Sequence, residues 1–342
     1  MNKQAFFFSD GRPALIGIAT AVLSACSMIP AYERPAAPVA QAWPVTTKEP
    51  ATASSVSNLP WQAFFTDASL KQLLDISLAN NRDLRVAALN IEQAAALLGL
   101  RRADQLPTVN GVIAGSRNPN GSGGMVSVYT AGLSITAYEF DFFGRIASLK
   151  EQALAQFLAS REARDAAHIS LIGAVAQTWF ALLSDEELLA ISRETVKTRE
   201  ESLKLIKLRA DNGASSDLDL RLAQSLLASA RVTLAQQQRQ RALDENALAL
   251  LIGQPLPLET RAKLADQRLT QFSLPELAAG LPSDLLIQRP DIRQAENLLA
   301  AANANIGAAR AAFFPRISLT TSVGLASKDL AGLFKGGNWA YS

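Results

Sequence analysis

The feature that most constrains this chain is a long stretch with almost no helix-breaking residues. No proline occurs between Arg145 and Asn212, where Gly173 is the single glycine, and residues 214–252 contain neither residue type. Proline and glycine are the residues that interrupt helices most effectively. At about 1.5 Å per residue the two segments would extend roughly 100 Å and 55 Å as α-helices, so we expect a long helical hairpin.

Apolar residues recur every seven positions along both segments, which is the spacing of a left-handed coiled-coil seam. Small alanines lie between the larger leucines, a pattern that lets two helices approach closely. The periodicity alone fits a soluble antiparallel coiled coil as well as it fits the wall of a channel. The seam consists of Leu182, Leu189, Val196, Leu203 and Ala210 in the first segment, and of Leu220, Ala223, Leu227, Ala230, Leu234 and Leu248 in the second.

The two helical segments meet at a short polar turn. Gly213 suits the left-handed conformation in which many helices end. Ser216 and Asp219 have the spacing of a capping box at the start of the next helix, where the helix dipole also favours a carboxylate. We therefore predict a tight tip formed by Asn212, Gly213, Ala214, Ser215 and Ser216.

Three other segments alternate apolar and polar residues with period two. Residues 129–137 do so over about ten residues, the length of a membrane-spanning strand, and residues 108–117 do so more weakly. A polar turn at 118–124 separates them, so residues 108–137 predict a β-hairpin. Residues 316–325 alternate in the same way. A soluble hairpin with one buried face has the same pattern, so the period does not decide between the two.

An internal repeat connects the helical and alternating segments. Residues 83–107 match residues 291–315 in one register without gaps, and each copy is a helical pattern that ends at a proline before an alternating segment. A fixed offset indicates duplicated architecture, with a first repeat at about 68–252 and an incomplete second repeat at about 283–342. The informative identities are Asp83 with Asp291, Arg85 with Arg293, Gly99 with Gly307, Arg102 with Arg310 and Pro107 with Pro315.

The first residues have the layout of an export signal. A short apolar stretch at 14–23 follows Lys3 and Arg12, which predicts a signal peptide at residues 1–25. It ends in Leu-Ser-Ala-Cys, which resembles a bacterial lipobox with Cys26 as the acylated residue. Ser27 follows it, whereas lipoproteins kept at the inner membrane tend to have Asp there, so we expect an outer-membrane destination. Residues 26–60 are proline-rich and predict a lipidated, extended tether along the outside of the protein.

Composition argues against catalysis and against nucleic acid as a partner. Lys and Arg number 33 and Asp and Glu 31, a formal net charge of +2, which provides no basic field. Cys26 is the only cysteine and His168 the only histidine, so a multi-thiolate metal site is excluded and His168 is best explained as a packed or solvated helix residue. No apolar run after residue 30 reaches the roughly 20 residues of a membrane helix. We expect no enzyme activity, no cofactor and no metal site.

Several short segments, in this order and spacing, resemble the outer-membrane efflux protein (TolC-like) family. Together with the lipobox, they are most similar to the lipoprotein subgroup that serves resistance–nodulation–division pumps. The segments are 32–38 (YERPAAP), 80–85 (NNRDLR), 138–145 (YEFDFFGR), 216–220 (SDLDL), 288–293 (QRPDIR) and 304–310 (ANIGAAR), the last followed by Phe314-Pro315.

The resemblance implies a mainly α-helical fold with membrane β-strands over residues 61–342. Long antiparallel coiled-coil helices would form a periplasmic α-barrel, and β-hairpins would join a trimeric, twelve-stranded outer-membrane β-barrel. The implied function is a passive conduit for drugs or other toxic compounds within a tripartite efflux pump. The implied partners are two further copies of the chain, a periplasmic adaptor, the inner-membrane pump and outer-membrane lipid. The tip at 212–216 would contact the adaptor, and Asp219 resembles an acidic residue near the tunnel constriction.

The sequence leaves two alternative functions open, and it differs from the family in one respect. A lipid-anchored periplasmic scaffold or adaptor would explain the lipobox and the coiled coil, and the same channel type also serves metal-ion efflux and type I protein secretion. Family members continue into a fourth strand and a second helical hairpin, whereas this sequence stops at Ser342. We therefore expect a C-terminally truncated chain with three strands, whose unpaired edge lipid does not tolerate. These residues alone would then form no working channel.

Overall fold

A computed structural model of the chain describes residues 27–35, 60–272 and 285–342. The signal peptide, Cys26 and most of the proline-rich tether lie outside the described residues. The described residues belong to two compact units, which we call the sheet unit and the helical unit. The sheet unit comprises the described residues up to 35, Ile91–Ser160 and Gln294–Ser342, and the helical unit comprises residues 60–90 and the described part of Arg161–Arg293.

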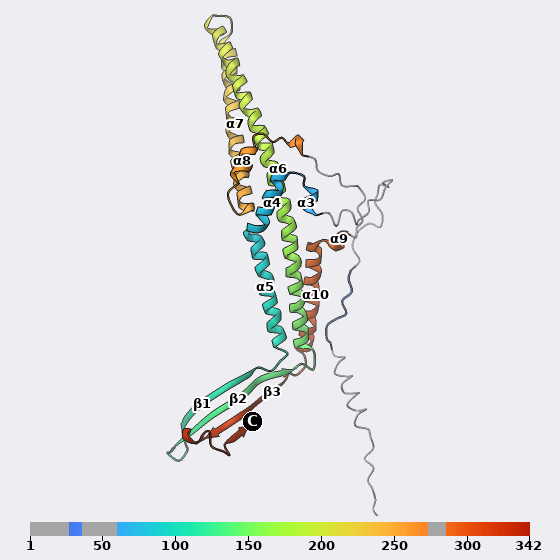
Figure 1. Ribbon diagram of the computed structural model, residues 1–342, viewed down its shortest axis with the longest axis vertical. Coiled ribbons are helices and arrows are strands. Elements are labelled where there is room, and N and C mark those ends of the chain that lie inside the picture. Colours follow the sequence, from blue (N-terminus) through green and yellow to red (C-terminus); the bar gives the residue numbers. More distant parts are fainter. Residues whose placement is uncertain (1–26, 36–59, 273–284) are drawn as a thin grey trace, which may run out of the picture. The chain divides into compact units, whose positions relative to one another are not determined.

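The sheet unit contains four antiparallel strands in the order β1-β2-β3-β4 (Figure 1). Their bounds are Val109–Pro119, Met125–Phe140, Ile317–Ser327 and Trp339–Tyr341. The predicted hairpin and third strand are confirmed, and β2 is longer than its alternation indicated. The expectation of three strands is wrong, because Trp339–Tyr341 pairs with β3 as a short fourth strand.

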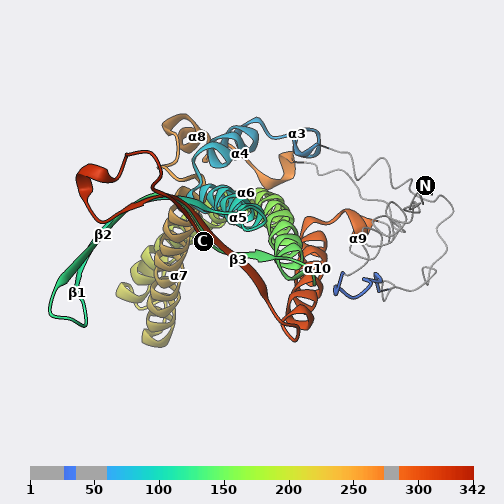
Figure 2. The same cartoon turned by 90° about the horizontal axis from the view of Figure 1, so that it is seen from below.

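Two long helices end in the sheet unit, and each leads into a strand. α5 (Arg82–Ala103) precedes β1, and α10 (Pro290–Ala311) precedes β3, which is the helix-then-strand order expected from the repeat. In Figure 2 the red strand β3 leaves the end of α10 directly. The prolines of the repeat, Pro107 and Pro315, lie in the short connections, where the missing N–H and fixed φ prevent the helix from continuing.

The helical unit is built around the antiparallel pair of α6 (Arg145–Asp211), which belongs to this unit from Arg161 onward, and α7 (Asp217–Ile252). Both helices were predicted, and all seam positions are buried or half-buried. The shorter elements of this unit are α3 (Trp61–Phe64), α4 (Ala68–Asn80), α8 (Leu258–Lys263), η1 (Leu269–Gln271) and α9 (Leu285–Gln288). The break expected at Asn80-Asn81 is therefore confirmed.

A hydrophobic core holds α4, α6 and α7 together with Leu256 and Leu264, the residues that flank α8. Its largest fully buried side chain is Trp179, whose Nε1 donates a hydrogen bond of 2.8 Å to Asp67 Oδ2. Asp67 also accepts from the Ser69 N–H at 2.9 Å and caps α4. One carboxylate therefore satisfies both the buried indole and the first turn of α4. The other members include Leu70, Leu73, Leu74, Leu182, Leu183, Leu248 and Ile252.

The break between α4 and α5 is tied to the end of α7. Ser77 Oγ and Asn81 Nδ2 each donate 2.9 Å hydrogen bonds to the carbonyl of Leu251. α7 then ends at Gly253, whose φ of 73° is left-handed. A Cβ at Gly253 would lie 2.6 Å from the Asn80 carbonyl oxygen, so both the conformation and the close approach require glycine here.

One described helix meets the length and composition criteria for a membrane span. Although α6 has no uninterrupted apolar run of twenty residues, an 18-residue window within it reaches a mean hydropathy of 1.5. Core helices of soluble proteins have the same composition, and α6 contributes the fully buried Val175, Trp179 and Leu183 to the helical core. About a third of that window is buried, so packing in the core accounts for part of its apolar character.

Candidate functional site: the strands, the strap and the helical tip

The two faces of the sheet differ in chemistry. The register places Val109, Ile113, Leu133, Ile135 and Val323 on one face, and Asn110, Ser116, Thr130, Ser134 and Ser322 on the other. Every residue of β1 is exposed, and no residue of β2 is buried. A soluble hairpin needs one face packed on a core, which this sheet does not have. Val112, Val126 and Val128 also lie on the second face, so the separation of apolar and polar residues is partial. Strands that are exposed on both faces and carry apolar residues match a membrane barrel wall better than a soluble hairpin.

The connection from β2 to α6 is fixed by charged groups. Arg145 at the start of α6 makes a bidentate pair with Glu139, with N–O distances of 2.8 and 2.6 Å. Asp141 Oδ1 and Oδ2 accept from the backbone N–H groups of Ile146 and Ala147 at 3.0 and 2.7 Å. A bidentate pair and an N-terminal carboxylate both restrict orientation. The YEFDFFGR segment is thus the structural joint where β2 ends and α6 begins.

The described residues 27–35, which we call the strap, lie along α10. Ile29 packs at Gly307, where an added Cβ would lie 2.6 Å from Ile29 Cγ1 and 2.8 Å from Ser148 Oγ. The Pro30 carbonyl accepts a 2.8 Å hydrogen bond from Asn303 Nδ2. Arg34 forms an ion pair with Glu296 on the same helix. The strap is therefore docked on α10 by apolar, polar and ionic contacts.

The tip between α6 and α7 has the predicted conformation. Gly213 has φ 69°, and the N–H groups of Gly213 and Ala214 donate to the carbonyls of Ala210 and Arg209 at 2.9 and 2.8 Å. This pair of bonds is a Schellman motif. Ser216 caps α7 by accepting from the Asp219 N–H at 3.1 Å, and Asp219 Oδ2 accepts from the Ser216 N–H at 3.1 Å.

Asp219 is held by hydroxyl groups as well. Ser216 Oγ and Ser215 Oγ donate to Asp219 Oδ2 at 2.7 and 3.1 Å. These side-chain and backbone hydrogen bonds hold the pKa of Asp219 below its ordinary value. The carboxylate is thus ionised and committed to the cap of α7, which is the structural role expected for it. Its role at a tunnel constriction stays a prediction.

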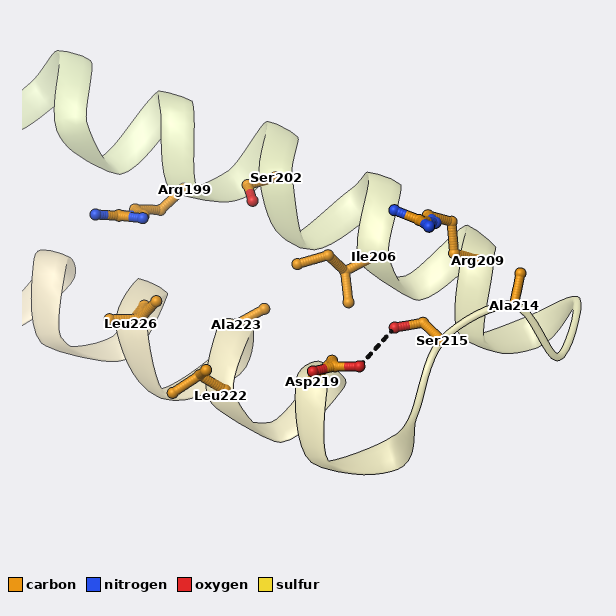
Figure 3. A pocket seen from close by; sticks show the side chains of 10 residues that line it. All are labelled: Arg199, Ser202, Ile206, Arg209, Ala214, Ser215, Asp219, Leu222, Ala223 and Leu226. Atoms are coloured by element: carbon orange, nitrogen blue, oxygen red, sulfur yellow. Dashed lines mark hydrogen bonds between the residues drawn. The ribbon is translucent and has the colours of Figure 1, made fainter.

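A groove of about 320 Å³ runs beside the tip between α6 and α7 (Figure 3). Arg199, Ser202, Ile206 and Arg209 contribute one wall from α6. The sequence reasoning missed this groove. The available signal was the spacing of these residues by three, four and three positions, which places them on one helix face.

Two facing aspartates are a second feature that the sequence reasoning missed. Asp185 on α6 is 7% exposed, and its Oδ2 has no hydrogen-bond partner among the described residues. Burial, followed by the hydrogen bond and charge of Asp244 on α7, raises the pKa of Asp185 to about 6. The signal was an acid three residues after Leu182, in a seam position where an apolar residue is usual.

Other candidate ligands do not cluster in the described part of the chain. No group of three or more His, Cys, Asp or Glu side chains there is arranged to hold a metal ion. His168 lies half-buried on α6, and desolvation lowers its pKa.

Comparison with known proteins identifies the family. The model of the outer membrane efflux protein family matches residues 73–254 and 281–342. The chain belongs to the outer membrane efflux protein family.

Relatives and solved structures agree with this membership. The chain is 43% identical over 332 residues to the probable efflux pump outer membrane protein TtgC of Pseudomonas putida, covering 94% of this chain and 68% of that protein. It is 42% identical to the outer membrane protein OprJ of Pseudomonas aeruginosa, covering 100% of this chain and 71% of that protein. The open-state MtrE outer membrane channel of Neisseria gonorrhoeae has a TM-score of 0.77 at 40% identity, covering 93% and 71% of the two chains.

This family membership confirms the predicted fold class and function. The chain is an outer-membrane channel component of a tripartite efflux pump, and proteins of this family are transport conduits. The lipid at Cys26, the domain boundaries and the roles of residues 212–216 and Asp219 stay predictions.

Proposed function

We propose that this efflux protein acts as a homotrimeric, passive conduit for drugs or other toxic compounds, and that it is not an enzyme. The observation that carries this proposal is a sheet whose strands β1 and β2 have no buried residue, so that neither of their faces packs on a core. In lipid, an open sheet edge leaves backbone groups unsatisfied at a cost of several kcal/mol each. The outer edges of β1 and β4 therefore pair with neighbouring copies, which closes a barrel.

Exposed apolar residues on the helices support assembly from several copies. Val86, Leu89, Leu97 and Leu100 on α5 are 49–63% exposed, so one face of this helix has no partner within the described chain. A large exposed apolar surface of this kind marks an interaction site. We infer that neighbouring copies cover it, and the family resemblance supplies the number three.

We further propose that Cys26 carries the lipid that the sequence predicts. It lies three positions before Ile29, a reach of at most about 11 Å. Ile29 is docked at Gly307, which lies four residues before the end of α10, or about 6 Å along the helix axis. Acyl chains on Cys26 would thus enter the membrane close to the level where β3 begins. Each buried CH₂ group would contribute roughly 0.8 kcal/mol to anchoring.

Replacing Cys26 by serine tests the lipid anchor. When cells grow with an alkyne-tagged fatty acid, the natural protein should become labelled. The Cys26→Ser variant should not. A matched Ser27→Ala variant should keep the label, because serine after the cysteine is not the acylated group. Labelling of the Cys26→Ser variant at the natural level would contradict the proposal.

The tip at residues 212–216 is proposed to contact a periplasmic adaptor, and Asp219 to lie near the tunnel constriction. The Schellman motif and capping box make the tip a rigid, short turn, which suits a docking surface. An adaptor and an inner-membrane resistance–nodulation–division pump would complete the assembly. Because the pump supplies the energy, the channel needs no catalytic group of its own.

The proposed cargo is a small, toxic organic compound. Relatives are named as antibiotic, toluene and solvent efflux pump outer membrane proteins. A conduit lined by small polar groups contacts its cargo weakly, so the cargo is set mainly by the pump. The same channel type with metal ions or secreted polypeptides as cargo is the second candidate.

An accumulation assay tests the conduit. A strain without its own outer-membrane efflux proteins would receive the adaptor and the inner-membrane pump. One version of the strain would also receive this protein, and the other would not. When the protein is present, the cells should accumulate less of an apolar aromatic dye, and their susceptibility to antibiotics should fall. An equal dye level in both strains, with the protein shown to be in the outer membrane, would refute the proposal.

A further inference from the structure

Three polar residues on α10 are spaced by seven positions and therefore lie on one face of the helix, two turns apart. Glu296 forms an ion pair with Arg34 of the strap, and Asn303 Nδ2 donates a 2.8 Å hydrogen bond to the carbonyl of Pro30. The third residue, Arg310, is exposed, and its side chain forms no ion pair or hydrogen bond with any described residue. Two members of this row therefore hold the strap, and the guanidinium of the third has no partner in the described part of the chain.

The strap runs antiparallel to α10 along this row. From Arg34 to Pro30 it advances four residues, while its contacts on α10 advance seven, or about 10 Å along the helix axis. Four residues reach at most about 14 Å, so this distance fits an extended strap. The same step from Pro30 leads to Cys26 on the strap and to Arg310 on the helix. We therefore expect the residue proposed to carry the lipid to lie at the level of this guanidinium.

An exposed aromatic ring follows Arg310 by one helical turn. Phe313 is 90% exposed and forms no aromatic pair with a described residue, whereas Phe314 stacks on Phe143 with ring centroids 4.5 Å apart. The N–H of Phe313 donates to the carbonyl of Arg310 at 3.2 Å, so the helical turn continues and the two side chains are neighbours on its surface. Aromatic residues of outer-membrane barrels concentrate where lipid meets water. The end of α10 thus presents a cation and an apolar ring together.

A phospholipid headgroup has the chemistry that satisfies both residues. A guanidinium binds phosphate through two parallel hydrogen bonds, and an aromatic ring at headgroup level packs against the glycerol and the first acyl carbons. An inorganic phosphate or a carboxylate would pair with Arg310 but would leave Phe313 in water. The helix dipole also favours a cation in the last turn. Arg102 has that same role at the equivalent position of α5, where Gly99 has open space instead of the strap, so Arg102 provides an internal comparison.

We propose that Arg310 and Phe313 bind the phosphate and adjoining glycerol of a membrane phospholipid, next to the acyl chains of Cys26. This inference rests on the proposed lipid anchor and adds a second, non-covalent lipid contact at the same level. The phospholipid would complete the row that begins with Glu296 and Asn303, because all three positions on this face of α10 then have a partner. It would also set the depth of α10 at the membrane surface, because headgroup phosphates occupy a narrow layer.

Lipid titration of the natural, full-length protein tests the site. The protein would be purified in detergent, and binding of phosphatidylglycerol would be followed by native mass spectrometry. Arg310→Gln should weaken this binding at least about tenfold, because the charged hydrogen bonds to phosphate are lost. Arg310→Lys keeps the charge and should bind within about threefold of the natural protein, and the matched control Arg102→Gln should bind within about twofold. Diacylglycerol with the same acyl chains lacks the phosphate, and it should bind the natural protein no better than phosphatidylglycerol binds Arg310→Gln.

A photo-reactive phenylalanine analogue at position 313 supplies a second readout in whole cells. It should crosslink to phospholipid, and much less so when Arg310→Gln is also present. Three results would overturn the phosphate site alone: equal phosphatidylglycerol binding by the natural protein and Arg310→Gln, displacement of the lipid by excess inorganic phosphate, or crosslinking of position 313 to another copy of this chain. If Cys26 takes up no fatty acid while phosphatidylglycerol binding still depends on Arg310, only the proposed lipid anchor fails.

Discussion

Replacing Asp185 by asparagine is expected to stabilise the protein at neutral pH. Asp185 is almost fully buried between α6 and α7, and it faces the carboxyl of Asp244. Two ionised carboxylates that face each other repel, and neither can donate a hydrogen bond to the other because each offers only acceptors. Glu186 adds a further negative charge, and Arg241 compensates only in part. An asparagine has similar size and can donate a hydrogen bond to Asp244.

The magnitude follows from the pKa difference between the folded and unfolded chain. The pKa of Asp185 is about 6 in the fold, against 3.8 for the ordinary group. Because the folded value is the higher one, ionisation destabilises the fold, and the full penalty applies above pH 6. The difference corresponds to roughly 3 kcal/mol at pH 7.5 and roughly 1 kcal/mol at pH 4.5. The penalty disappears as the pH falls below the unfolded value.

The assay is thermal unfolding of the purified protein in detergent at pH 7.5 and pH 4.5. For a chain of this length 3 kcal/mol corresponds to a rise in Tm of about 4 °C, and 1 kcal/mol to a little over 1 °C. Asp244→Asn should give a similar gain, and the double variant should gain less than the sum, since each substitution removes the same repulsion. The control is Glu201→Gln, an exposed carboxylate on the same helix, which should change Tm by less than about 1 °C.

A fall in Tm of the Asp185→Asn variant that is equal at both pH values would refute this reasoning. It would mean that the carboxylate makes a favourable contact in its ionised form. A gain that is independent of pH would also refute it, because the benefit would then come from packing rather than from removal of a charge.

Two glycine pairs give further predictions. Gly307→Ala should release the strap, because the added Cβ meets Ile29, and the rate of hydrogen exchange of residues 27–35 should rise. The control is Gly99→Ala, at the equivalent position of the repeat, where the space around the glycine is open. It should leave that exchange rate unchanged. Gly253→Ala should lower Tm more than Gly213→Ala, since both positions are left-handed but only Gly253 also meets a backbone carbonyl. The free energies of unfolding of the two variants should differ by at least about 1 kcal/mol. Equal effects in thermal unfolding would contradict the close contact.

Local sequence determined most of the elements of this protein. The absence of proline and the seven-residue spacing were sufficient to predict α6 and α7, because helix formation and coiled-coil packing depend on neighbours within one or two turns. The tip was predictable for the same reason. Gly213, Ser216 and Asp219 act through hydrogen bonds that span at most five residues.

Two strand features needed tertiary structure. Trp339–Tyr341 is too short to show a period of its own, and it is a strand only because β3 offers a free edge. The chemistry of the sheet's faces was likewise ambiguous, since period two is common to soluble and membrane strands. The register and the exposure of β1 decided it, because they show that neither face has a core to pack on.

Contacts between site residues on different helices could not be predicted from local sequence. Arg199 and Leu222 become two walls of one groove, and Asp185 meets Asp244, only when α6 and α7 are aligned antiparallel. Gly99 and Gly307 are equivalent in the repeat, yet only Gly307 receives the strap. The sequence by itself determined which segments are helix, turn or strand, because those choices depend on short-range sterics and hydrogen bonds. Tertiary structure alone decided which distant side chains share a space, because that depends on the alignment of whole elements.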